Sequence, residues 1–115
     1  MQRTFCFGVD ILKFLMTLRK NDIFGIIIFQ LGKSATSRGS NYEEAQGAES
    51  PQDFNHKIGI VLKEVGESNY WLRVLKEVIK NSSSNDELMR LFDESIELKK
   101  IFSTIKIKAQ NKLNS

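Results

Sequence analysis

The sequence predicts an all-α fold, an antiparallel up-down-up-down four-helix bundle, and three observations support this prediction. Apolar residues recur at helical spacing in four segments. The connections between these segments are short, and short connections make successive helices antiparallel neighbours. Residues 23–31 could also form a buried strand, but no second strand is available to pair with it. The 115 residues fit one domain, residues 1–115, with helices expected at 5–20, 23–47, 51–80 and 85–112.

The first expected helix, residues 5–20, is apolar over more than half of its circumference. One stripe consists of Phe5, Val9, Leu12 and Met16, and a second row consists of Ile11, Leu15 and Leu18. A helix of this kind is expected to be buried on two sides. The single cysteine, Cys6, is expected to be a small core residue.

The second segment poses a choice between a helix and a flexible linker. Residues 31–54 contain three glycines, many hydroxyl side chains and the only proline. Their helix propensity is unfavourable by about 5 kcal/mol, whereas burying each large apolar side chain returns about 1.5–3 kcal/mol. A continuous apolar seam favours the helix: Phe24, Ile27, Ile28, Leu31, Ala35, Arg38, Tyr42 and Ala45. A polar stripe beside that seam is expected to make contacts inside the bundle or between subunits: Ser34, Ser37, Asn41 and Glu44.

The third segment, residues 51–80, has the clearest start signal. Ser50 is an expected N-cap, Pro51 suits the first helical position, and Asp53 stands three residues after the cap. The expected core stripe is Phe54, Ile58, Val61, Val65, Leu72, Leu75 and Ile79. A second apolar face holding Trp71, Val74 and Val78 is a candidate subunit interface, with packing of Trp71 inside its own chain as the alternative.

The fourth segment, residues 85–112, follows a polar connection in which Ser84 and Glu87 form an expected capping box. Its apolar side carries Leu88, Leu91, Phe92, Leu98, Phe102, Ile105 and Ala109. No acidic residue follows Glu97, whereas five lysines do: Lys99, Lys100, Lys106, Lys108 and Lys112. These lysines, with Arg19 and Lys20 of the first helix, are the candidate nucleic-acid-binding residues. The alternative is that they only complement the helix dipole.

Neither catalysis nor membrane insertion is supported. His56 is the only histidine, and no second histidine or cysteine stands at metal-ligand spacing from it. We therefore expect no enzyme activity, no cofactor and no metal. The longest uncharged apolar run is residues 23–29, far short of the roughly 20 residues of a membrane span, so a cytoplasmic protein is expected.

One long stretch carries a family resemblance. "QLGKSATSRGSNYEEAQGAESPQDFNHKIGIVLKEVGESNYWLRVL" resembles the four-helix bundle family of 23S rRNA intervening-sequence proteins, in residue type and in spacing. Lys33 stands where the family has arginine, and Arg38 and Tyr42 stand where it has isoleucine. Because Arg38 lies on the core seam, it must reach solvent along its stem or pair with a carboxylate such as Glu64 or Glu67.

The resemblance implies a small bacterial helical protein that assembles as a homopentamer around a central channel. The family's molecular function is not established. More distantly similar retroelement accessory subunits form basic pentamers that bind protein and nucleic acid. Two functional interpretations stay open: an oligomeric adaptor that binds RNA or a nucleic-acid-processing protein, and a purely structural or protein-interaction module.

Overall fold

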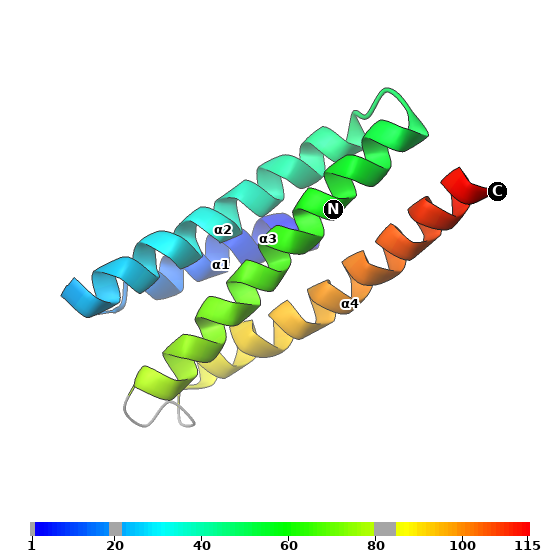
Figure 1. The fold of residues 1–115 in the computed structure, drawn as a ribbon. Helices are drawn as coiled ribbons and strands as arrows, with labels where there is room; N and C mark the ends of the chain where they lie inside the picture. The colour runs from blue at the N-terminus through cyan, green and yellow to red at the C-terminus, as the bar shows by residue number, and fades with distance from the viewer. Residues whose placement is uncertain (1, 19–21, 80–84) are drawn as a thin grey trace.

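The computed structural model describes residues 2–18, 22–79 and 85–115 and contains four helices in this part of the chain. They are α1 (Gln2–Leu15), α2 (Asp22–Gln46), α3 (Pro51–Val78) and α4 (Asp86–Asn114). Helix α1 packs against α2 and α4, and α3 packs against the same two helices from the other side (Figure 1). The bundle measures 50 × 22 × 20 Å. The predicted all-α four-helix bundle is confirmed.

Side-chain pairs across the helix interfaces establish the antiparallel order. On α3 and α4, Asn69 bonds to Ser95 while Asn55, earlier on α3, bonds to Lys106, later on α4. Partner numbers therefore run in opposite directions along the two helices. Helices α1 and α2 show the same order, because Thr4 contacts Arg38 whereas Gly8 lies against Ala35.

The helix bounds answer the question posed by residues 31–54. Helix α2 continues to Gln46, and α3 starts at Pro51 after a short connection, so the linker alternative is wrong. The expected helix at 5–20 is misplaced at both ends, because α1 begins at Gln2 and ends at Leu15. Its last turn closes when the Thr17 hydroxyl and backbone N–H both donate to the Phe14 carbonyl, at 2.6 and 3.0 Å.

The start of α3 is capped as predicted. Ser50 adopts an extended backbone and its hydroxyl accepts from the Asp53 N–H at 3.0 Å. The Asp53 carboxylate accepts from the Glu49 N–H and from Lys57, and the bond to Lys57 is the main reason that its pKa is lowered. Helix α4 is capped by the Asn85 side chain, which accepts from the Leu88 N–H. Ser84, the predicted cap, lies outside the described residues.

The core confirms the expected seams of α2, α3 and α4. Their centre is fully buried: Leu31, Ile58, Val61, Val65, Leu72, Leu75, Leu88, Leu91, Leu98 and Phe102 are all 0% exposed. Helix α1 confirms one of its two expected rows, since Ile11 and Leu15 are buried, together with Phe7 and Phe14. The expectation that its other row is also buried is wrong, because Phe5 and Met16 are 61% and 82% exposed. Cys6 is also exposed rather than buried, because it lies on the side of α1 that faces away from the bundle.

None of the described helices combines the length and the apolar character that crossing a bilayer requires.

Candidate nucleic-acid interface

The lysines of α4 do not form one continuous face. Helical geometry places Lys99 and Lys108 about 180° apart around the helix axis. Lys99 and Lys100 border a groove of about 520 Å³ together with Asn69, Ser103 and Thr104. Lys108 and Lys112 border a different groove, beside the α2–α3 connection. The predicted basic stretch is therefore two pairs of cations on different sides of α4.

Lys106, the remaining lysine of this stretch, has a structural role in the described fold. Its ammonium donates to the Asn55 carbonyl at 2.9 Å and to the Asn55 side-chain oxygen at 3.0 Å. Gly59 leaves the space for it, since a Cβ there would lie 3.2 Å from the ammonium. The side chain ties the C-terminal half of α4 to the first turns of α3, so it is a poor candidate for contacting a phosphate.

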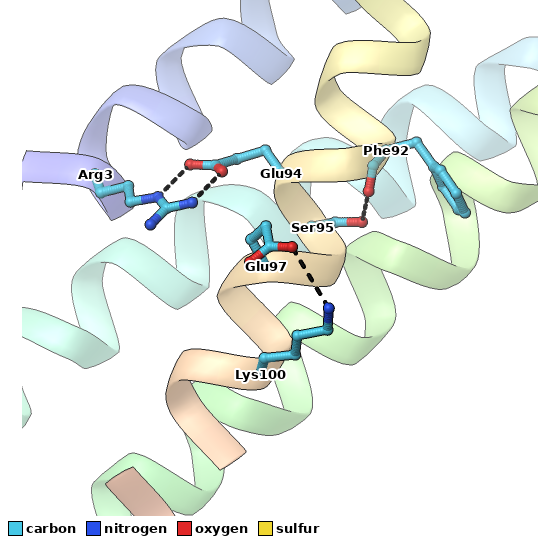
Figure 2. A network of polar contacts seen from close by, with 6 residues as sticks. All are labelled: Arg3, Phe92, Glu94, Ser95, Glu97 and Lys100. Atoms are coloured by element: carbon cyan, nitrogen blue, oxygen red, sulfur yellow. Dashed lines mark hydrogen bonds and ion pairs between the residues drawn. The ribbon is translucent and has the colours of Figure 1, made fainter. Parts of the chain in front are cut away.

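Some of the other basic side chains form ion pairs with glutamates. Figure 2 shows Lys100 paired with Glu97 at 3.5 Å, and Arg3 of α1 paired with Glu94 of α4. Both ends of the Arg3 fork bond to that carboxylate, at 2.7 and 2.6 Å, and these bonds raise the pKa of Arg3. Lys99, Lys108 and Lys112 make no ion pair with any described residue. Arg19 and Lys20 lie outside the described residues.

Arg38 does not reach solvent. Its side chain is 0% exposed, its Nη2 donates to the Thr4 carbonyl at 3.1 Å, and its guanidinium lies 4.4 Å from the Phe7 ring centroid. The other two guanidinium nitrogens, Nε and Nη1, have no hydrogen-bond partner among the described residues. Burial lowers the pKa of Arg38 to about 10, and the negative charges of Glu64 and Glu94 oppose that effect. The expected direct carboxylate partner is therefore wrong: α1 supplies a carbonyl and an aromatic ring instead.

The polar stripe of α2 is divided between the interior and the surface. Ser34 is buried and its hydroxyl lies 2.9 Å from that of Ser68 on α3. Ser37 and Asn41 are half-buried and Glu44 is exposed. The sequence analysis did not identify Ser68, Asn69 and Ser95, which are buried and form hydrogen bonds between helices. All three stand within or beside the apolar stripes of their helices, and this position was the signal that could have found them.

The candidate subunit interface on α3 lies at the edge of the core. Trp71 and Val74 are half-buried and pack against the core of their own chain, and Tyr70 meets the Trp71 ring edge-on at 5.0 Å between centroids. Val78 is 48% exposed. Other apolar side chains are more exposed, namely Phe5 and Leu12 of α1, Met16 directly after it, and Ile26 and Phe29 of α2.

Among residues 2–18, 22–79 and 85–115, no group of three or more His, Cys, Asp or Glu side chains is arranged to hold a metal ion. His56 is exposed. The described surface offers electrostatic attraction by lysines and contact by apolar side chains.

Comparisons with known proteins agree with the resemblance. Residues 1–104 match the family model described as 23S rRNA-intervening sequence protein. The chain is also similar to a crystal structure of a protein of unknown function from the S23 ribosomal protein family of Bacteroides thetaiotaomicron. The two are 31% identical, with a TM-score of 0.76 over 91% of this chain and 95% of that one. No curated protein matches the chain. Neither the family nor the neighbour carries the name of an enzyme.

Proposed function

Because the chain belongs to the 23S rRNA-intervening sequence protein family, we propose that it is a non-enzymatic, homo-oligomeric adaptor that binds RNA in the bacterial cytoplasm. The observation that carries this proposal is the end of α4. Five lysines and no acid follow Glu97, and Lys99, Lys108 and Lys112 are exposed with no ion pair to a described residue. Unneutralised cations of this kind are what a phosphate backbone binds.

Self-association would bring the exposed lysines of several copies together in one assembly. A ring of five copies, the assembly that the family resemblance implies, would repeat each lysine pair around its axis and raise avidity without any new contact. The exposed apolar side chains of α1 and α2, among them Phe5, Ile26 and Phe29, support self-association, since an interface between copies would remove them from water. Trp71, Val74 and Val78 remain the alternative interface. Light scattering coupled to gel filtration tests this part, and a strict monomer would contradict it.

The RNA proposal is tested with a labelled RNA stem-loop in electrophoretic shift assays at several salt concentrations. Two double variants remove the pairs separately: Lys99→Gln with Lys100→Gln, and Lys108→Gln with Lys112→Gln. A charge-matched control, Lys33→Gln with Lys63→Gln, removes two exposed lysines from α2 and α3. Each phosphate-binding lysine that is removed is expected to reduce the slope of log affinity against log salt by about 1.

Two results would contradict RNA binding through α4. Either the wild-type protein does not shift the RNA even at about 50 mM salt, where phosphate contacts bind more tightly than at higher salt, or both α4 variants bind as the control does. The second candidate, a structural or protein-interaction module without nucleic-acid binding, would then be favoured by the exposed apolar side chains of α1.

A further inference from the structure

Helices α3 and α4 meet along a seam that carries both aromatic and basic side chains. Two contacts join the helices there: the Asn69 amide donates to the Ser95 hydroxyl at 2.9 Å, and the Lys76 ammonium lies 4.0 Å from the centroid of the Phe92 ring. Spacings of three and four residues place each set on one helix face. The set on α3 is Asn69, Arg73 and Lys76, and the set on α4 is Phe92, Ile96, Lys99 and Ser103.

Two hollows follow one another along this seam. One has a volume of about 250 Å³ and is bordered by Tyr70, Arg73 and Phe92. The other, of about 520 Å³, is bordered by Asn69 and Lys99. Phe92 and Lys99 are two helical turns apart, which is about 10 Å along α4. The two hollows therefore form one surface of a length that a few nucleotides can follow.

Tyr70 gives this surface a fixed and accessible aromatic ring. It is 52% exposed, and its ring packs edge-on against Trp71, with 5.0 Å between centroids and 84° between planes. Gly66, one turn earlier on α3, has no side chain that could cover the ring, and the space where a Cβ would stand is open. Such a ring is a platform for a nucleobase, because every base has a π-face that can stack.

Cations stand beside the ring. Arg73, three residues after Tyr70, is exposed and makes no ion pair with any described residue, and the same holds for Lys99 at the second hollow. Glu77 is the acidic residue among the described residues that border the two hollows. We infer that this seam binds RNA as a single strand, with a base stacked on Tyr70 and backbone phosphates on Arg73 and Lys99.

The ring distinguishes a single strand from a duplex. In an A-form duplex the bases are stacked on one another, and proteins recognise it through its shape, its 2′-hydroxyls and its phosphates. Unpaired bases can turn out and stack on aromatic side chains, next to cations that follow the backbone. The inference rests on the proposed RNA binding and adds to it the class of RNA and two residues, Tyr70 and Arg73.

Fluorescence anisotropy with the full-length protein tests the strand preference. The probe is a fluorescein-labelled, unstructured RNA of about 10 nucleotides, which is within the range of single-strand binding sites. The comparison is a blunt duplex of the same sequence. The single strand is expected to bind more tightly. Its affinity should fall more in Lys99→Gln with Lys100→Gln than in Lys108→Gln with Lys112→Gln, because the second pair borders a different groove.

Substitutions at Tyr70 test the stacking. Tyr70→Leu keeps an apolar side chain but removes the ring, and it should weaken the single strand by about five- to a hundredfold. Tyr70→Phe keeps the ring and should bind as wild type does. Circular dichroism verifies that both variants fold. A strand containing 5-iodouridine should crosslink under ultraviolet light at position 70, as mass spectrometry can map, and Tyr70→Leu should lose this crosslink.

Substitutions of single charges test the path of the backbone. Arg73→Gln should reduce the slope of log affinity against log salt by about 0.7, the value for one phosphate of a single strand. The matched control, Lys33→Gln, removes an exposed cation from α2 and should leave the slope unchanged. Glu77→Gln should strengthen binding, because it removes a negative charge from the border of the first hollow.

Four results would overturn the inference: equal or tighter binding of the duplex, wild-type affinity of Tyr70→Leu, crosslinks that map away from position 70, or a lower assembly mass of Tyr70→Leu in light scattering. The last result would assign the ring to contact with a second copy. If the duplex binds and only the α4 lysine variants weaken it, this inference fails and the proposed function stands. If neither RNA binds, both fail.

Discussion

The half of the bundle that α1 covers differs from the half beyond its N-terminus in what its interior can hold. In the covered half, four helices enclose Arg38, the Ser34–Ser68 contact and the Asn69–Ser95 bond. In the open half, Phe54, Ile105 and Ala109 line a groove and remain half-exposed. The same apolar repeat along α4 thus lines a closed core at one end and an open groove at the other.

Truncating one apolar residue in each half gives the largest expected difference. Leu72, in the covered half, is 0% exposed, and Leu72→Ala should reduce the free energy of unfolding by about 3–5 kcal/mol, through lost burial and the cavity left behind. Ile105 is half-exposed at the groove, and Ile105→Ala should cost only about 1 kcal/mol. Urea denaturation measures both. Equal losses would mean that the open half is in fact packed.

Replacing Arg38 by an apolar side chain should stabilise the protein. Arg38→Met removes a buried charge with two unpartnered N–H groups, and exchanges of this kind are neutral or stabilising by about 1–4 kcal/mol. Because burial lowers the pKa of Arg38 to about 10, the folded and unfolded states are both charged below that pH. The gain should therefore be constant between pH 6 and 9. A large loss of stability would show that the contacts with Thr4 and Phe7 outweigh desolvation.

The buried serine contact should show strong coupling between its two hydroxyls. Ser34→Ala alone leaves the Ser68 hydroxyl without its partner on α2, at an expected cost of about 1 kcal/mol. The double variant with Ser68→Ala should cost less than the sum of the two single changes, because no orphaned hydroxyl remains. A double-mutant cycle from thermal denaturation measures the coupling. Strictly additive losses of stability would contradict this prediction.

Replacing Glu64 should have the smallest effect on the free energy of unfolding. Burial raises its pKa, and the positive charge of Arg38 is among the influences that lower it. A carboxyl pKa that is raised on folding contributes stability below the unfolded pKa, and that contribution is lost as the pH rises through the folded pKa. Glu64→Gln should therefore flatten the decline in stability just above pH 4.5. In Arg38→Met the pKa of Glu64 should rise further, as NMR titration can measure, and a fall would contradict the placement of the two groups.

The sequence predicted the parts of the fold that depend on local spacing. The α2 seam from Phe24 to Ala45 and the Ser50–Pro51 start of α3 needed only periodicity and capping chemistry. Helix α1 was expected to be buried on two sides because it is apolar over more than half of its circumference. Only the side of Ile11 and Leu15 is buried, and spacing alone could not show that the Phe5 side is exposed.

The candidate site depended more on tertiary contacts. Five lysines that are neighbours in sequence are distributed around α4, and Asn55 engages Lys106 across the α3–α4 interface. The carbonyl and ring that receive Arg38 come from α1, some thirty residues away. No local pattern encodes such a partner, because it is set by where the helices stop.

Chemical labelling tests the openness of the three-helix half most directly. In a Cys6→Ser background, Ala109→Cys places a thiol in the groove and Ala35→Cys places one between α1 and α2, where the native side chain is 1% exposed. Under native conditions, maleimide is expected to react with the thiol at position 109 nearly as fast as in urea, while the thiol at position 35 stays protected. Equal protection at both positions would show that the groove is covered in solution and would contradict the account of an open half-bundle.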